Sequence, residues 1–160
     1  MNINLRDVRD SDLGIFFEYQ QDKDAVYMAA FTSKDPADKE AFLAHWTKIR
    51  ANDAIIIKTI IVDKIVVGYV LTYVQAGQRE ITYWIGKSYW GKGITSKAVS
   101  LYLLLIKERP VFARVAKDNI GSKRVLEKCG FKIIGDDKGF ANARDKEIEE
   151  YIMQLEQLSQ

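Results

Sequence analysis

The chain has 160 residues, of which 48% are hydrophobic and 29% are charged. Both values are close to those of globular domains, and they exclude a wholly disordered or fibrous chain. The formal net charge of +2, from 24 basic and 22 acidic residues, argues against a dedicated nucleic-acid-binding protein, which needs a basic excess. We expect one domain that covers residues 1–160.

Cysteine and histidine are scarce, because Cys129 and His45 are the only residues of their types. A single cysteine cannot form an internal disulfide, which favours a reducing, cytoplasmic setting. A zinc site or a Cys–His nucleophile pair would need nearly every such residue, so we expect no metal. The first residues lack the apolar core of a signal peptide, and the longest apolar runs fall far short of the ~20 residues that span a membrane. We therefore expect no membrane partner.

The first fifty residues predict a strand and two helices. Weak alternation favours a strand over residues 3–8. Asp10 or Ser11 is typical of a helix N-cap and predicts a helix to about residue 21. Residues 24–30 fit either a short helix or a loop. Asp35-Pro36 combines an acidic N-cap with proline at the first helical position, which predicts a helix to about residue 50.

The middle of the chain predicts a hairpin followed by a third strand. Residues 54–62 and 65–74 are rich in β-branched side chains, and only Asp63-Lys64 separates them. Residues 80–86 have the same strand character. A glycine-containing turn at residues 90–93 then precedes a buried helix over residues 94–109.

The last third predicts alternating strands and helices. A short strand over residues 110–116 starts at Pro110, a position that tolerates proline. Asp118 or Asn119 caps a helix that extends to Cys129, and Gly130 is typical of a residue that ends a helix. Residues 131–135 and 148–155 have strand character, and residues 136–145 between them predict a polar loop.

The predicted order is β-α-α-β-β-β-α-β-α-β-β, which indicates an α/β fold with a sheet of mixed direction. The crossover from residues 80–86 through a helix to residues 110–116 should be right-handed, with the two strands parallel.

The segment YWIGKSYWGKGITSKA, residues 83–98, leads from a strand through a glycine turn into a helix. The first-turn amides of a helix have no internal partner, and with the helix dipole they form an anion site. Glycines let a ligand approach the backbone closely. The turn fits a pyrophosphate site and, equally, an ordinary strand-to-helix turn. It matches neither the Walker pattern nor the dinucleotide-binding glycine pattern.

A second segment, ARVAKDNIGSKRVLEKCGF at residues 113–131, places Asn119 and Ser122 at a helix start. Together the two segments resemble the GNAT superfamily of acetyl-CoA-dependent N-acetyltransferases, in particular the branch that includes the ribosomal-protein N-terminal acetyltransferases. That family's Q/R-x-x-G-x-G/A pattern falls on residues 90–95. Its second pattern, N-x-x-S-x-x-V-L-x-K-x-G-F, falls on residues 119–131.

The resemblance implies a GNAT-like fold in which two parallel strands, residues 80–86 and 110–116, splay apart and hold acetyl-CoA. The pantetheine arm would bond to the open strand edge as an added strand does. Asn119 and Ser122 would contact this arm or the leaving thiol, and Lys123 would meet the 3′-phosphate or lie on a solvated helix face. The implied cofactor contacts are Tyr83, Trp84, Ile85, Trp90, Gly91, Lys92, Gly93, Ile94, Thr95, Ser96, Asn119, Ser122 and Lys123.

Three positions depart from the family pattern. Trp90 replaces glutamine or arginine, and Thr95 replaces glycine or alanine. Leu126 occupies the position at which many relatives carry a tyrosine that acts as general acid. The role of that tyrosine must pass to another group or to solvent.

The implied reaction is the attack of a free amine on the acetyl carbonyl, with a backbone N–H polarising the carbonyl oxygen. Amines are largely protonated near neutral pH, so the reaction needs a base. Glu80 is the candidate base, directly or through water, with an exposed strand-start carboxylate as the alternative reading. Tyr83 and Tyr89 are weaker candidates, and we expect His45 and Cys129 to be structural or surface residues.

The resemblance places the acceptor site at residues 18–32 and 136–145. Asp22, Asp24, Asp136 and Asp137 either attract a cationic amine there or are solvated surface acids. We expect a peptide N-terminus or a small amine as acceptor and a monomer or homodimer. The alternatives are a catalytically weak acetyl-CoA-binding regulatory domain and a protein whose glycine turn is purely structural. Helical dihedrals at Gly93 would let the free protein accept alanine there, whereas a positive φ would not.

Overall fold

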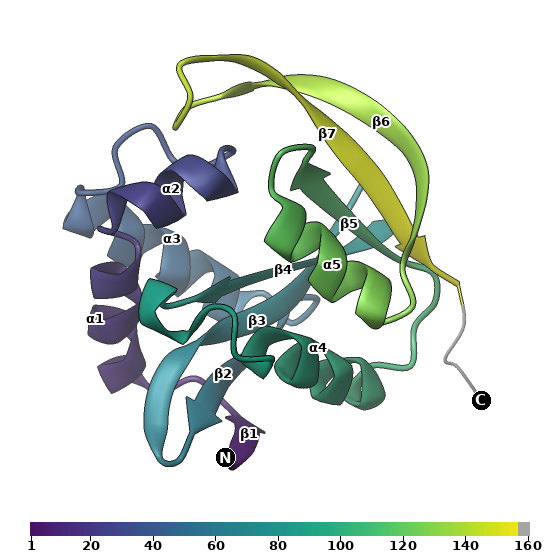
Figure 1. Ribbon diagram of the computed structural model, residues 1–160. Coiled ribbons are helices and arrows are strands. Elements are labelled where there is room, and N and C mark those ends of the chain that lie inside the picture. The colour runs from purple at the N-terminus through teal and green to yellow at the C-terminus, as the bar shows by residue number, and fades with distance from the viewer. Residues whose placement is uncertain (157–160) are drawn as a thin grey trace.

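A computed structural model of the protein describes residues 1–156 and contains a seven-stranded sheet with helices on both faces (Figure 1). The strand order is β1-β2-β3-β4-β5-β7-β6. The pair β4–β5 is parallel and the other neighbouring pairs are antiparallel. The predicted α/β fold with a mixed sheet is therefore confirmed.

The strands are β1 (Ile3–Arg6), β2 (Ile56–Val62), β3 (Ile65–Gln75), β4 (Gln78–Ile85), β5 (Val111–Ala116), β6 (Lys132–Ala141) and β7 (Lys146–Leu155). The helices are α1 (Asp10–Tyr19), α2 (Lys23–Ala29), α3 (Lys39–Ala51), α4 (Ile94–Leu105) and α5 (Ile120–Lys128), with a short 3-10 helix, η1 (Lys87–Tyr89), after β4. None of the helices within residues 1–156 combines the length and the apolar character that a membrane crossing requires.

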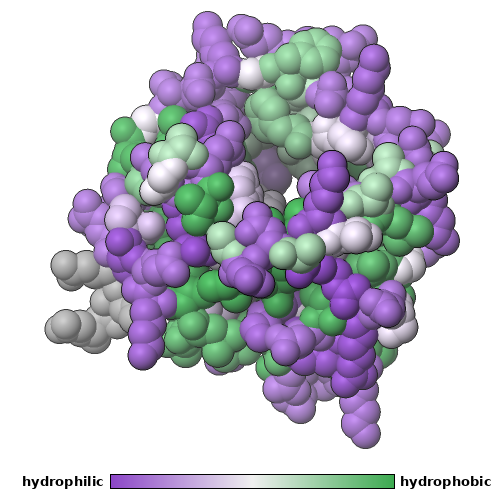
Figure 2. All heavy atoms as spheres, turned by 180° about the vertical axis from the view of Figure 1, so that it is seen from behind, coloured by the Kyte–Doolittle hydropathy of each residue, from purple (hydrophilic) through white to green (hydrophobic). Residues whose placement is uncertain are grey.

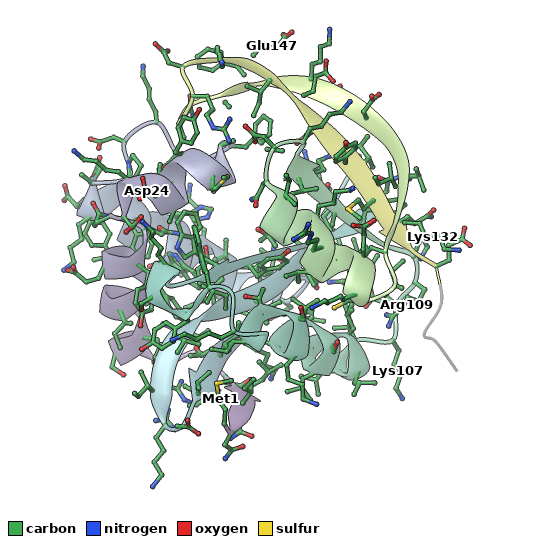
Figure 3. All side chains as sticks on the ribbon, in the orientation of Figure 1. Met1, Asp24, Lys107, Arg109, Lys132 and Glu147 are labelled. Carbon is green, nitrogen blue, oxygen red and sulfur yellow. The ribbon has the colours of Figure 1, made fainter. Side chains whose placement is uncertain are left out.

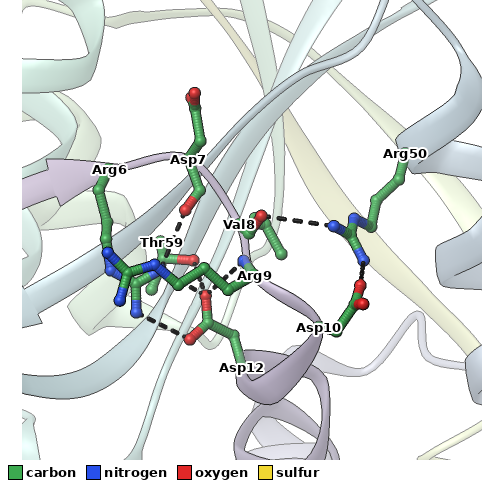
Figure 4. Close-up of polar contacts among 8 residues, drawn as sticks. All are labelled: Arg6, Asp7, Val8, Arg9, Asp10, Asp12, Arg50 and Thr59. Atoms are coloured by element: carbon green, nitrogen blue, oxygen red, sulfur yellow. Dashed lines mark hydrogen bonds and ion pairs between the residues drawn. The ribbon is translucent and has the colours of Figure 1, made fainter.

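A buried carboxylate fixes α1 against the sheet (Figure 4). Asp12 is 1% exposed and accepts hydrogen bonds from the Arg6 guanidinium (2.7 and 2.8 Å), the Thr59 hydroxyl (2.8 Å) and the Arg9 amide (2.9 Å). Burial by itself raises the pKa of Asp12, but these hydrogen bonds outweigh burial and hold that pKa below its usual value. Because Asp12 bonds back to Arg9, the N-cap of α1 is residue 9, which is one residue before the predicted Asp10 and two before the predicted Ser11.

The next two helices also start at side-chain caps. The undecided segment 24–30 is helical, because Asp22 accepts a hydrogen bond from the Ala25 amide at 2.9 Å and caps α2. The helix predicted from Asp35-Pro36 begins later, at Lys39. Asp38 is its cap, whereas Asp35 accepts from an amide within the preceding turn.

Helix α4 ends at Leu105, four residues before the predicted end. A residue that precedes proline disfavours the helical conformation, and Pro110 follows closely. The Arg109 guanidinium donates to the carbonyls of Leu103 and Ile106, each at 3.1 Å. These bonds satisfy carbonyl groups that a helix end leaves without internal partners.

The C-terminal hairpin is the largest difference from the sequence-based expectation. Residues 136–141, predicted to be a polar loop, belong to β6, and only a short turn separates β6 from β7. The sequence of β6 is polar because it is an edge strand with mostly exposed side chains. Its pairing with β7 continues to Ala141 and includes the opposite-charge pair Lys138–Glu149.

The two main hydrophobic cores lie on opposite faces of the sheet. The larger one joins the sheet to α4 and α5 and includes Tyr102 and Leu126. The smaller one joins β3 to α1 and α3 and contains Phe16, Trp46 and Tyr69. Ring centroids of Trp46 and Tyr69 lie 4.8 Å apart in an edge-on arrangement. The smaller core is therefore rich in aromatic side chains.

Candidate functional site

Strands β4 and β5 separate soon after they start. Their parallel ladder has two positions, Arg79 with Val111 and Glu80 with Phe112, although both strands continue for several residues. On its other side β4 stays paired with β3 to the end of the strand. Within the described residues, the β4 edge that faces β5 is thus open beyond Glu80 and can bond an extended ligand arm. The predicted contacts on this open stretch are Tyr83, Trp84 and Ile85.

The turn between β4 and α4 presents backbone amides at a helix start. Gly91 and Gly93 have φ values of +74° and +77°. A Cβ atom added at either glycine would meet no atom within 4 Å, so a phosphate can approach the backbone. The Trp90 indole fixes the turn by donating to the Ile85 carbonyl at 2.9 Å. The residues of this turn fit a pyrophosphate group.

The positive φ of Gly93 excludes the helical dihedrals considered for this residue. The other predicted turn residues have distinct surroundings. The Lys92 ammonium lies 5.9 Å from the centre of the Tyr89 ring. Ile94 is buried in the larger core, so only its backbone is available to a ligand. Thr95 lines the cavity described below, and the Ser96 carbonyl accepts a hydrogen bond from the Cys129 thiol at 3.6 Å.

Asn119 is the N-cap of α5. Its side-chain oxygen accepts from the Ser122 amide at 3.2 Å, and its amide group donates to the Met28 carbonyl at the end of α2 at 3.3 Å. One side chain therefore links α5 to the segment predicted to form the acceptor site. The Lys123 ammonium lies 3.8 Å from the Glu127 carboxylate and 5.6 Å from the centre of the Tyr151 ring.

Ser122 faces β4. Its hydroxyl lies 2.6 Å from the Tyr83 hydroxyl. Burial raises the pKa of Tyr83, so this phenol stays protonated and can donate. Leu126, at the position where relatives carry a tyrosine, is 1% exposed and packs in the core. Burial also raises the pKa of the Cys129 thiol, which agrees with a structural role.

Glu80 is buried rather than an exposed strand-start carboxylate. It is 7% exposed and accepts from the Arg114 guanidinium at 3.2 Å. The same guanidinium donates to the carboxylates of Glu150 at 2.6 Å and Asp137 at 3.2 Å. These carboxylates raise the pKa of Arg114, and its positive charge holds them together at the point where β4 and β5 separate.

Sequence reasoning missed three residues of this cluster: Tyr73, Arg114 and Glu150. Tyr73 lies directly opposite Glu80 in the β3–β4 hairpin, and burial and the neighbouring Glu80 raise the pKa of Tyr73 to about 12. The short connection between β3 and β4 could have indicated this pair. In a hairpin with a tight turn, residues at equal distances on either side of the turn face each other, and Tyr73 and Glu80 are such residues. No local signal marked Arg114 or Glu150, since long-range pairing of β5 with β7 brings them together.

The four acids predicted near the acceptor site all have partners. Asp22 caps α2, and Asp24 forms an ion pair with Lys87. The Asp136 carboxylate lies 2.9 Å from the Lys117 ammonium, and Asp137 bonds to Arg114. Three of the four carboxylates therefore lie in ion pairs, whereas the partner of Asp22 is a neutral backbone amide. The residues described by the structure contain no group of three or more His, Cys, Asp or Glu side chains placed to hold a metal ion.

Hydrogen bonds and an ion pair of Arg144 hold the tip of the β6–β7 hairpin against α2 and the start of α5. Arg144, whose side chain is 3% exposed, donates to the Asp118 carboxylate at 2.6 and 2.9 Å and to the Tyr27 carbonyl at 2.6 Å. The Ala143 amide donates to the Ala30 carbonyl at 3.1 Å. Figure 1 shows the hairpin curving over the sheet toward α2. The side-chain view places Lys132 at the base of this hairpin and Glu147 near its tip (Figure 3).

One continuous cavity of about 1440 Å³ connects these features. Its lining includes the glycine turn, the Glu80–Arg114 cluster and residues of α2, α3 and α5. From behind, the molecule is visibly hollowed, with hydrophobic side chains at the upper rim (Figure 2). Ordinary ligand sites measure about 300–1,000 Å³. The cavity is thus larger than an ordinary site for a single ligand.

The family pattern described as "Acetyltransferase (GNAT) domain" matches residues 2–132. No curated protein sequence matches the chain. The chain belongs to the GNAT acetyltransferase family, whose members use acetyl-CoA as the acetyl donor. The resemblance identified from the two motifs is therefore confirmed.

Solved structures with the same fold include three whose descriptions name a ligand or an activity. Mycobacterium smegmatis RimJ in complex with CoA-disulfide is 19% identical, with a TM-score of 0.79 over 96% of this chain and 81% of that one. Vibrio cholerae spermidine N-acetyltransferase with CoA and spermine is 17% identical, with a TM-score of 0.80 over 97% and 95%. Vibrio fischeri ribosomal-protein-S5-alanine acetyltransferase is 18% identical, with a TM-score of 0.77 over 98% and 93%. At these identities the likeness shows the fold.

Proposed function

We propose that the protein transfers the acetyl group of acetyl-CoA to a primary amine by direct attack of the amine. One observation carries this proposal: the β4 edge opens directly beside Glu80, a buried carboxylate that lines the cavity. A thioester laid along that edge would have its acetyl group next to a proton acceptor. The separation of β4 and β5 provides the place for the ligand arm, and the glycine turn provides a site for its pyrophosphate.

The residues have distinct roles in this proposal. The turn at Gly91 and Gly93 binds the pyrophosphate through backbone amides, and the open edge of β4 binds the pantetheine arm. Bound there, the thioester supplies an acetyl carbon that a neutral amine can attack. Glu80 takes a proton from the amine, and Arg114 keeps its carboxylate in position. Ser122, oriented by Tyr83, donates a hydrogen bond to the leaving sulfur.

A catalytically weak acetyl-CoA-binding domain is the second candidate. The observation that favours it is the ion pair between Glu80 and Arg114, which competes with the amine for the candidate base. The buried Leu126 in place of the family's tyrosine points the same way.

A thiol-release assay with acetyl-CoA and a panel of amines and peptides tests the proposal. A thermal shift with coenzyme A, acetyl-CoA and ATP runs beside it. A ligand at 100 times its Kd should stabilise the protein by about 2.7 kcal/mol. Thiol release with an amine supports the enzyme, and stabilisation by both CoA species without thiol release supports the binding domain. Stabilisation by neither CoA species contradicts both.

A further inference from the structure

The two faces of β4 serve different parts of the cavity. Side chains alternate along a strand, so Ile81, Tyr83 and Ile85 point to the larger core and to α5. Glu80, Thr82 and Trp84 point to the opposite face, which α1 and α3 cover. Any acceptor that reaches Glu80 from the α3 side therefore lies against this second face.

The second face is aromatic around Glu80. The cross-strand partners of Glu80, Thr82 and Trp84 on β3 are Tyr73, Leu71 and Tyr69, in that order. All six side chains belong to residues that line the cavity. Helix α3, which covers this face of the sheet, contributes further cavity-lining residues, namely Phe42, Trp46 and Ile49. Trp46, Tyr69 and Leu71 are packed in the smaller core. The half-buried Phe42, Tyr73 and Trp84 therefore supply the accessible aromatic surface of the space that leads to Glu80.

The carboxylates that line the cavity are either exposed or belong to the Arg114 cluster. Asp35 and Asp38 accept hydrogen bonds from backbone amides at 3.1 and 3.0 Å. Glu80, Glu150 and Asp137 share the single Arg114 guanidinium, so this cluster keeps a net negative charge that one ammonium group beside Glu80 can offset. Past Glu80, none of the residues named above on the second face is a carboxylate, so a ligand with several ammonium groups would bury its additional charges there against aromatic and aliphatic side chains, which is unfavourable. One ammonium group beside Glu80 is compatible with this arrangement.

We propose that the acceptor is a monoamine that carries an aromatic or similarly bulky apolar group. The inference rests on the proposed function and names its acceptor class. The apolar group packs between Trp84 and Phe42, and the nitrogen lies beside Glu80. One ammonium proton passes to Glu80, and the neutral nitrogen bonds to the acetyl carbon as the carbon–sulfur bond breaks. A second nitrogen proton leaves with the thiolate, which gives free coenzyme A.

The native protein is tested by measuring kcat/KM for phenethylamine, tryptamine, ethylamine, spermidine and a tetrapeptide with N-terminal alanine. We expect phenethylamine to exceed ethylamine by about 100-fold, because single apolar groups in a fitted pocket already contribute 10- to 200-fold. Phenethylamine should also exceed spermidine and the peptide. Equal or faster turnover of spermidine or the peptide overturns the inference while the acetyltransferase function stands.

A pair of variants on adjacent residues of α3 localises the effect. Phe42 is half-buried and lines the cavity, whereas Leu43 is exposed and does not. Phe42→Asp should lower kcat/KM for phenethylamine at least 10-fold and leave acetyl-CoA binding unchanged, and Leu43→Asp should match the native protein. If Phe42→Asp does not fold, Phe42→Ala replaces it, with the same expected direction. An unchanged amine preference in a folded Phe42 variant contradicts the inference.

Failure of the acceptor inference can be told apart from failure of the proposed function. Acetyl-CoA binding is followed by thermal shift in each of these proteins. Binding with no turnover of any amine overturns both the acceptor class and the transferase activity, and leaves the binding-domain alternative. Turnover of amines without the apolar preference overturns the acceptor class alone.

Discussion

The hydroxyl groups of Tyr83 and Ser122 lie 2.6 Å apart and join β4 to α5 across the gap between β4 and β5. Neither residue stands at the position of the family's tyrosine, which Leu126 occupies. If the pair acts on the leaving sulfur, Ser122→Ala and Tyr83→Phe should each lower kcat about 10-fold or more. Their effects should be strongly non-additive in the double variant, because each removes the same hydrogen bond. Additive losses would show that the two hydroxyls act independently.

Replacing Glu80 tests the candidate base against a matched control. Glu80→Gln should lower kcat/KM by about 10²–10⁴ and leave the Kd for acetyl-CoA unchanged. Glu150 is equally buried and bonds to the same guanidinium, so Glu150→Gln disturbs Arg114 without removing the base. Steady-state kinetics of both variants decide the question. Equal losses in the two variants would assign the effect to the position of Arg114.

Replacing glycine by alanine should have opposite effects in the glycine turn and in α1. Gly93→Ala forces alanine into a left-handed conformation, which should destabilise the free protein by about 1–2 kcal/mol. The added methyl group also takes space beside the amides, so the Kd for acetyl-CoA should rise. Gly14→Ala, in the exposed interior of α1, should instead stabilise the protein by about 0.5–1 kcal/mol. Urea unfolding and thermal shift measure both, and an unchanged Kd in Gly93→Ala would contradict a phosphate site there.

The hydrogen-bonded carboxylate of Asp12 should make the folded protein less stable in acid. Its folded-state pKa is lowered from an unfolded value near 3.9, so the ionised carboxylate stabilises the fold above that pH. This contribution is lost as the pH falls through the folded-state pKa. Asp12→Asn should cost about 1–3 kcal/mol at pH 7, because buried donors lose their acceptor.

The control for this prediction is Asp10→Asn. Asp10 is an exposed neighbour whose only ion pair within the described residues is with Arg50 (Figure 4). Asp10→Asn should change the free energy of unfolding by less than about 1 kcal/mol. Melting temperatures between pH 3 and 7 test both variants, and the Asp12→Asn curve should be the flatter one at the acid end. A curve parallel to that of the native protein would contradict the role given to Asp12.

The contacts of Arg144 should order the end of α2 and the start of α5, because they join both segments to the hairpin tip. Arg144→Lys keeps the positive charge but cannot bond Asp118 at two points while donating to the Tyr27 carbonyl. We expect a lower melting temperature, together with faster hydrogen exchange at the end of α2 and the start of α5. Lys146→Arg, two residues further along the hairpin, serves as the control. Exchange that changes only within the hairpin would show that the contacts of Arg144 do not order the other two segments.

Most elements were predictable because their signals are local. The β-branched runs of β2 and β3, the glycine stop after α5 and the cap at Asn119 depend on neighbours in sequence. The polar half of β6 was not predictable, because its strand conformation depends on pairing with β7. The same limit applies to the site. The motifs indicated the glycine turn and Ser122, whereas the Arg114 cluster exists only after four strands, β4 to β7, have assembled.

The continuity of the cavity has a consequence for the order of events in turnover. Residues of the glycine turn and residues of α3 line the same cavity. The donor and the acceptor can therefore bind at the same time, at different positions in that cavity. Both would be present when the acetyl group moves, and no acetylated form of the protein would be needed. Initial-rate plots at varied concentrations of both compounds should then give intersecting lines.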